Sequence, residues 1–187
     1  KLFFIFEMNL NNLFMDLSTS SIKSTIISFG LLLGVISVTF QVMLYFLDMH
    51  YKNDSTAGIV SLIIMVGILF YSFTQFKKSN DGFISLSEAL KIGIGVSLVS
   101  ALVGVLYTQI LINFIDPDTM TKSLELSMET MRIQNPEMPQ EAFDTVRSIQ
   151  EKMSSPLVLS AVQIIFALFF GFIISLIVGL IVKKSKP

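Results

Sequence analysis

The stretch ALKIGIGVSLVSALVG, residues 89–104, combines a long apolar run with small residues at regular intervals. Three glycines interrupt the run, but proline is absent from it. Residues four positions apart share one face of an α-helix. A row of small side chains therefore forms along that face, namely Ala89, Gly93, Ser97 and Ala101. In a bilayer such a row marks a surface where a second helix can approach closely. The stretch thus predicts a tightly packed membrane helix.

The composition supports a membrane location for the whole chain. Of the 187 residues, 52% are hydrophobic and 14% are charged, and the mean hydropathy is +0.73. Soluble domains carry about 25% charged residues. The chain has no cysteine and one histidine, His50, which excludes disulfides, thiolate catalysis and metal sites built from several cysteines or histidines of one chain. The net charge of −1 gives no general attraction to nucleic acid.

Four charge-free stretches can each cross the hydrocarbon layer, which takes about 20 residues of helix. They cover residues 24–47, 57–76, 92–115 and 156–182. Because the backbone must satisfy its own hydrogen bonds in lipid, we expect each stretch to be a helix. The predicted fold class is all-α, an integral membrane four-helix bundle.

The lysines predict the orientation of these spans. One side of the membrane receives Lys23, Lys77, Lys78, Lys91, Lys183, Lys184 and Lys186. The other side receives Lys52 and the connection 116–155, which has eight acidic and four basic residues, a net charge of −4. The positive-inside rule therefore predicts that residues 1–23 and 183–187 are cytoplasmic and that the connection is external.

The connection 116–155 is expected to form a helical hairpin. Asp116-Pro117 is typical of a helix start, Asn135-Pro136 of a helix end, and a second helix is predicted from about Pro139. Each helix carries an apolar stripe: Met120, Leu124, Met128 and Met131 on the first, and Ala142, Val146, Ile149 and Met153 on the second. The stripes could pack on each other, on the membrane surface or on a partner protein.

Small residues recur outside the opening stretch. They are Gly30 and Gly34 in the first span, Ser100, Gly104 and Thr108 in the third, and Ala167, Gly171, Ser175 and Gly179 in the fourth. Such rows permit close helix packing. Two interpretations remain open: the rows pack the spans of one subunit together, or they bind a neighbouring membrane protein.

No charged residue lies within a span, which argues against a transporter coupled to ions or protons. The polar residues inside the spans are Gln41, Gln109, Asn113 and Gln163. These side chains either link helices by hydrogen bonds or line a substrate pathway. Glu88 and Lys91 lie at the start of the third span. Either Glu88 is an acidic residue favoured by the helix dipole and paired with Lys91, or the two residues anchor a cytoplasmic partner.

Asp48, His50 and Asp54 lie close together in one short loop and could hold a cation, but clusters of this size more often belong to a plain solvated loop, which is the favoured interpretation. We assign no metal site to them. The chain also lacks the Walker A, GxSxG and HExxH motifs and paired catalytic carboxylates. The sequence therefore predicts no enzyme activity and no cofactor.

The block FKKSNDGFISLSEALKIG, residues 76–93, together with Tyr107 and the FIDP stretch 114–117, resembles the DUF4199 family. The resemblance covers the chain from about Met8, and residues before Met8 depart from the family pattern. It implies a small four-span protein of the inner membrane, found chiefly in Bacteroidota, and no catalytic residue can be transferred. The preceding residues contain an apolar run too short to span and no cleavage site, so a disordered or interfacial segment is expected, with Met8 as a candidate start.

Our leading hypothesis is a non-catalytic accessory subunit of a cell-envelope membrane complex. The small-residue helix faces and the external hairpin would dock the partner, which is another integral membrane protein or a second copy of the chain, in contact with the lipid bilayer. The alternatives are an oligomeric transporter of lipids or small solutes, and a helper of a membrane glycosyltransferase.

Overall fold

A computed structural model describes residues 21–52 and 54–185 of the chain. The predicted N-terminal segment up to residue 20, with Met8, and the tail residue Lys186 lie outside the described residues. The helices are α2 Ile22–Phe46, α3 Ser55–Ser79, α4 Leu86–Ile110, α5 Thr119–Gln134, α6 Gln140–Met153 and α7 Pro156–Val182. A π-helical turn, η1 (Leu111–Ile115), extends α4. Within the described residues there is no β-strand, and the chain is an all-helical protein.

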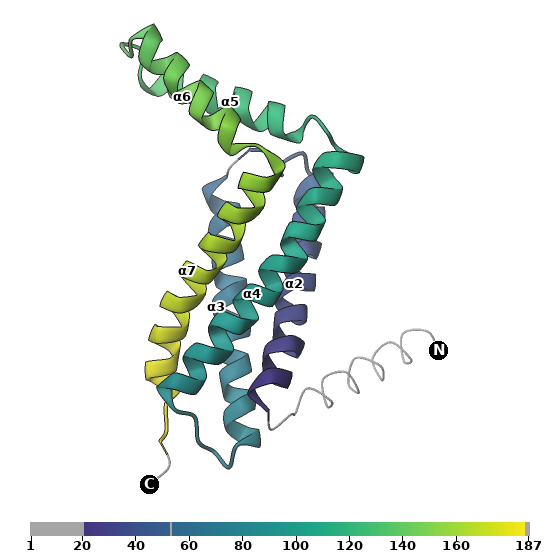
Figure 1. Ribbon diagram of the computed structural model, residues 1–187, viewed down its shortest axis with the longest axis vertical. Coiled ribbons are helices and arrows are strands. Elements are labelled where there is room, and N and C mark those ends of the chain that lie inside the picture. Colours follow the sequence, from purple (N-terminus) through teal and green to yellow (C-terminus); the bar gives the residue numbers. More distant parts are fainter. Residues whose placement is uncertain (1–20, 53, 186–187) are drawn as a thin grey trace.

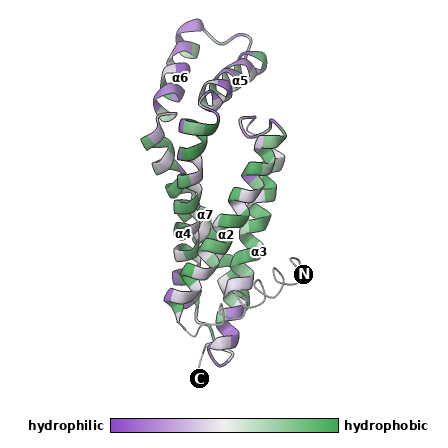
Figure 2. Cartoon of the chain, turned by 90° about the vertical axis from the view of Figure 1, so that its right-hand side faces the viewer, coloured by the Kyte–Doolittle hydropathy of each residue, from purple (hydrophilic) through white to green (hydrophobic). Residues whose placement is uncertain are grey.

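Four helices are long and apolar enough to cross a membrane: α2, α3, α4 with η1, and α7. This confirms the predicted all-α class and the four spans. Figure 1 shows the four helices side by side, with the hairpin of α5 and α6 across one end. Figure 2 shows hydrophobic residues along the long helices and hydrophilic residues in the hairpin and at the opposite end. We call the end that carries α5 and α6 the hairpin end. We call the opposite end the lysine end, after Lys77, Lys78, Lys183 and Lys184.

The third span begins at Leu86, six residues before the predicted boundary at residue 92. A capping box starts the helix: the Ser85 hydroxyl accepts a hydrogen bond from the Glu88 backbone N–H at 3.2 Å, and a Glu88 carboxylate oxygen accepts one from the Ser85 N–H at 2.8 Å. The predicted boundary counted only charge-free residues, whereas the helix itself begins earlier, with Glu88 in its first turn and Lys91 in its second. The interpretation of Glu88 as a helix-start acid is therefore confirmed.

The buried core lies toward the lysine end. Burial on α2 ends at Gly34, burial on α3 begins at Leu69, and burial on α7 begins at Gly171. The central helix α4 is the exception, because it is buried from Ala89 to Tyr107. Among the core side chains are Phe29, Leu33, Leu69, Phe73, Phe76, Ile84, Ile92, Val96, Ile174, Val178 and Val182. Toward the hairpin end, α2, α3 and α7 therefore have few buried contacts.

The loop from α3 to α4 and the end of α7 are joined at the lysine end. Ile84 and Lys184 form an isolated β-bridge, with backbone hydrogen bonds of 3.0 and 2.8 Å. The Lys77 ammonium donates a 2.7 Å hydrogen bond to the carbonyl of Val182, the last residue of α7. Both contacts satisfy backbone groups that a helix end or loop would otherwise leave unpaired.

The small-residue rows of α4 and α7 face each other. A methyl group added at Gly93 would overlap the Ser175 side chain, and one added at Gly171 would overlap Ser97. One added at Gly179 would lie 3.0 Å from the Ala89 Cβ. Backbones this close are possible only with small side chains, which matches the packing rule for membrane helices. The other row residues on these helices are Ala101, which is buried, and Ala167, which is half-buried.

The glycines of α2 contact the opposite side of α4. A methyl group at Gly30 would lie 2.5 Å from the Val99 Cβ, and one at Gly34 would lie 2.8 Å from the Val103 Cβ. Gly104 faces the side-chain amide of Gln163 on α7. The predicted small-residue surfaces are therefore occupied inside the subunit, and the structure does not leave them free for a second protein.

Replacing Gly93 by alanine should destabilise the fold by about 1–3 kcal/mol, because the new methyl group overfills the contact with Ser175. Gly67→Ala on α3 is the matched control, since nothing lies within 4 Å of a methyl group there. Unfolding in mixed micelles, followed by circular dichroism, measures both. Equal stability of the two variants would contradict the packing described here.

Candidate functional site

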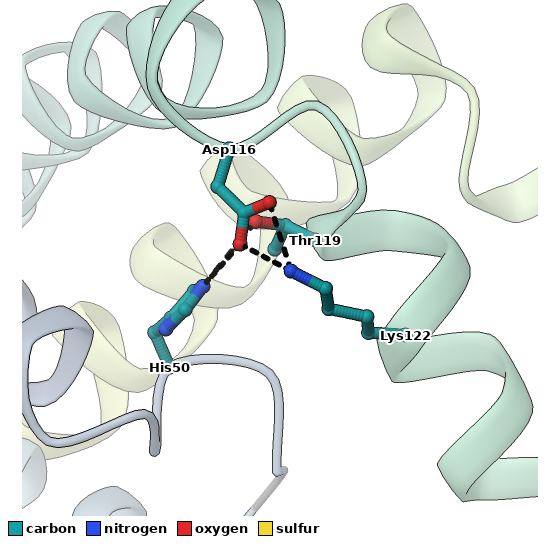
Figure 3. Close-up of polar contacts among 4 residues, drawn as sticks. All are labelled: His50, Asp116, Thr119 and Lys122. Carbon is teal, nitrogen blue, oxygen red and sulfur yellow. Dashed lines mark hydrogen bonds and ion pairs between the residues drawn. The ribbon is translucent and has the colours of Figure 1, made fainter.

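A polar cluster at the hairpin end connects the α2–α3 loop to the base of the hairpin (Figure 3). It consists of His50, Asp116, Thr119 and Lys122, and we call it the Asp116 cluster. The His50 Nε2 lies 3.2 Å from one Asp116 carboxylate oxygen, and the Lys122 ammonium lies 3.1 Å from both carboxylate oxygens. The Thr119 hydroxyl is 3.3 Å from His50 Nε2. One carboxylate thus joins segments that are 66 positions apart in the chain.

The π-helical turn η1 positions Asp116. The Asp116 N–H donates a 2.8 Å hydrogen bond to the carbonyl of Leu111, five residues earlier, and the backbone of Asp116 is non-helical. Such turns occur frequently at functional sites. The prediction that Asp116 caps the hairpin helix was wrong, since α5 begins at Thr119 with Asp118 at the N-cap. The reason is tertiary: the Asp116 carboxylate is engaged by His50 and Lys122 instead.

His50 is buried, with 3% of its side chain exposed. Its ring lies between those of Tyr45 and Tyr51, with centroid distances of 5.0 and 5.1 Å. The second ring nitrogen, Nδ1, is buried and has no hydrogen-bond partner. A buried N–H without an acceptor costs free energy. This arrangement favours the tautomer that carries its proton on Nε2, where Asp116 accepts it.

The electrostatics of the cluster favour an ionised Asp116. Burial by itself raises the pKa of this carboxyl group, but the hydrogen bonds from Lys122, His50 and Thr119 and the charge of Lys122 lower it more. The pKa of Asp116 therefore lies below its ordinary value of 3.8. The same hydrogen bond raises the pKa of the Lys122 ammonium. The arrangement is a structural ion pair rather than a poised acid or base.

The three loop residues considered as cation ligands do not converge. The Asp54 carboxylate caps α3 by accepting a 2.9 Å hydrogen bond from the Thr56 N–H, while His50 is engaged with Asp116. Asp48 is exposed. Over residues 21–52 and 54–185, no group of three carboxylate or histidine side chains could hold a metal ion.

The polar residues of the third and fourth spans connect α4 to the first turns of α7. The Gln109 amide donates hydrogen bonds to the Pro156 carbonyl at 3.1 Å and to the Ser160 hydroxyl at 3.0 Å. The Thr108 hydroxyl donates a 3.4 Å bond to the side-chain carbonyl of Gln163. These bonds favour the interhelical interpretation over a substrate pathway.

The other two predicted intramembrane polar residues behave differently. The Asn113 side chain donates back to the Gln109 carbonyl at 2.7 Å, within its own helix. Gln41 lies on α2 and takes no part in these hydrogen bonds. Two of the four residues, Gln109 and Gln163, therefore bind neighbouring helices.

The hairpin buries only one of its two stripes. On α5, Met128 is buried, and Met120, Leu124 and Met131 are half-buried. On α6, Val146 is half-buried, while Ala142, Ile149 and Met153 are exposed. Ile149 and Met153 have 52% and 48% of their surface accessible. The first stripe is therefore more buried than the second, in which three of the four residues are exposed.

Sequence reasoning missed Thr119 and Lys122 as members of the cluster. Lys122 is six positions after Asp116, which is not a helical pairing interval, so no local rule connects them. Thr119 is 3% exposed although it begins a helix outside the membrane spans. The one feature of the sequence that could have indicated the cluster was the isolated histidine, His50, with Tyr51 directly after it and Tyr45 five positions before it.

The fold and the polar contacts between its spans define a multi-pass helical membrane protein. The family model described as a protein of unknown function, DUF4199, matches residues 28–184, which is most of the chain. The chain belongs to this family, which confirms the resemblance seen in residues 76–93. No curated protein and no solved structure matches the chain.

Asp116→Asn should increase hydrogen exchange about tenfold in the first turn of α5 and in the loop holding His50, because it removes the charge that both partners bind. Asp118→Asn is the matched control, since the Asp118 side chain makes no capping hydrogen bond. Mass-spectrometric exchange on the purified chain measures both. Equal exchange in the two variants would refute the connecting role of Asp116.

Lys122→Met should raise the pKa of Asp116, because it removes a hydrogen bond and a positive charge. Since the folded-state pKa is lowered, ionised Asp116 stabilises the fold above about pH 3.8, and this contribution is lost as pH falls through the folded-state pKa. Carboxyl carbon NMR shifts recorded against pH measure the titration. An unchanged midpoint in the variant would show that Lys122 does not set it.

Proposed function

We propose that the protein is a non-catalytic accessory subunit of a bacterial cell-envelope membrane complex and that the exposed face of α6 binds the partner. The observation that carries this proposal is the apolar stripe of α6, where Ile149 and Met153 are exposed on a helix outside the spans. Apolar side chains gathered on one face outside the hydrocarbon layer are typical of a protein-binding surface.

The hairpin is well suited to present such a face. On the polar side of α6, Arg147 pairs with Glu151 at 3.0 Å. At the tip, the Arg132 guanidinium lies 4.2 Å from the centre of the Phe143 ring. At the base, the Asp116 cluster fixes the start of α5 to the α2–α3 loop. The contact at the tip joins α5 to α6, and the contacts at the base join α5 to the α2–α3 loop, so both restrict the motion of the hairpin. Such restriction reduces the entropy lost when a partner binds.

The proposal no longer includes the small-residue rows as docking surfaces. Gly93, Gly171 and Gly179 are buried between α4 and α7, and Gly30 and Gly34 are buried between α2 and α4. A partner inside the bilayer would therefore meet the larger apolar side chains on the outer faces of the bundle. The partner of the α6 face is another integral membrane protein with an external domain, rather than nucleic acid.

The orientation is part of the proposal. Lys77, Lys78, Lys91, Lys183 and Lys184 lie at or near the end of α3, the start of α4 and the end of α7, opposite the hairpin, whose connection has a net charge of −4. The positive-inside rule then assigns both termini to the cytoplasm of a bacterial inner membrane and the hairpin to the external side. The transport alternative has less support, because Gln109 and Gln163 are used between helices.

Photocrosslinking in living cells tests the α6 face. A benzoylphenylalanine at position 149 should yield a crosslinked product with one other membrane protein, identified by mass spectrometry. The matched control is position 148, an exposed serine on the same helix, which should yield little product.

Two outcomes would contradict the proposal. A product of twice the 20.9 kDa chain mass alone would show a homo-oligomer without a foreign partner. Equal products from positions 148 and 149 would show that the apolar stripe is not the contact surface.

A further inference from the structure

A hollow of about 230 Å³ lies between the hairpin and the first turns of α7. Three helices contribute to it: α5, the end of α6 and the start of α7. Its lining residues are Ser123, Leu124, Ser127, Gln150, Met153, Ser154, Leu159 and Val162. We call it the hairpin hollow. It is separate from the Asp116 cluster and from the exposed side of Ile149.

The hairpin hollow lies where the apolar span of α7 meets the hairpin, and we infer that the hydrocarbon layer ends at this level. The residues of α7 carry no charge from Pro156 onward, and Leu159 and Val162 belong to its first two turns. The remaining lining residues come from the charged, external hairpin. Because a helix rises 1.5 Å per residue, these two α7 positions are within about 10 Å of the first residue of the span. A bilayer places its glycerol and ester groups at this depth.

Polar side chains from the hairpin and apolar side chains from both the hairpin and α7 line the hollow. Ser123, Ser127, Ser154 and Gln150 supply hydroxyl and amide groups from the hairpin, and no lining side chain is charged. The apolar side is made of Leu124 and Met153 of the hairpin and Leu159 and Val162 of α7. The connection that contains the hairpin has a net charge of −4, which disfavours an anionic ligand. Hydroxyl and ester groups match this lining better than a phosphate does.

The apolar side continues along the span. Burial on α7 begins only at Gly171, and burial on α3 only at Leu69, so the halves of both helices nearer the hairpin bury no side chain fully. On the same half of α7, Val158, Ile165 and Phe166 are 37%, 64% and 57% exposed. Below the hollow, an acyl chain therefore meets exposed apolar side chains of α7.

We propose that the hairpin hollow binds the head of an uncharged glycerolipid, with the chemistry of diacylglycerol, and that an acyl chain of this lipid lies along the outer half of α7. Met153 belongs both to this lining and to the apolar stripe of α6, so the two proposals share one residue, whereas Ile149 belongs to the stripe alone.

Binding of tritiated dioleoylglycerol to the purified full chain in detergent tests the proposal. We expect saturable binding that Leu159→Trp weakens at least tenfold, since the indole fills the hollow. Leu180→Trp is the matched control, because Leu180 is 46% exposed, lies at the lysine end of α7 and is outside the lining. We expect its affinity to stay within twofold of the unmodified chain. Unlabelled phosphatidylglycerol should compete at least tenfold more weakly than unlabelled dioleoylglycerol.

Circular dichroism would reveal whether Leu159→Trp fails to fold. In that case a second pair of variants tests the proposal. Ser127→Leu removes a hydroxyl group from the hollow and should also weaken binding, whereas Ser148→Leu on the exposed side of α6 should not. Non-saturable binding, equal affinities within either pair, or equal competition by phosphatidylglycerol would each overturn the proposal.

Discussion

The close approach of α4 to α7 and α2 is the contact on which the remaining structure depends. Apolar side chains gain little by leaving lipid for a helix interface, so association relies on van der Waals contact between backbones that come close together. Gly93 against Ser175 and Gly171 against Ser97 provide that contact on one side of α4, and Gly30 against Val99 provides it on the other. These contacts place α4 at the centre of the bundle.

The two ends of the bundle are held by different forces. At the lysine end, tight packing is completed by the Ile84–Lys184 bridge and by the bond from Lys77 to the end of α7. At the hairpin end, α2, α3 and α7 bury no side chains fully, and polar groups such as Gln109 and the Asp116 cluster supply the connections. Both proposed binding surfaces lie at this less densely packed end.

The hairpin illustrates how far local rules extend. Asn135-Pro136 and Pro139 correctly predicted where α5 ends and where α6 begins, because these residues act on the backbone next to them. Asp116-Pro117 led to a wrong prediction of the first residue of α5. An aspartate in this local pattern can cap a helix, but here its carboxylate binds side chains from other parts of the structure. Thr119 and Lys122 could not be predicted, because their roles depend on a loop far away in the chain.

The sequence by itself determined the four spans, the helical class and the positions of the small residues, because hydrocarbon thickness, backbone hydrogen bonding and helical periodicity act along a single segment. Only the tertiary structure decided what each surface contacts. It paired the row on α4 with the row on α7, turned His50 toward Asp116, and left the stripe of α6 exposed. The physical reason is that contact between distant segments depends on how whole helices pack, and one segment's pattern fits several neighbours equally well.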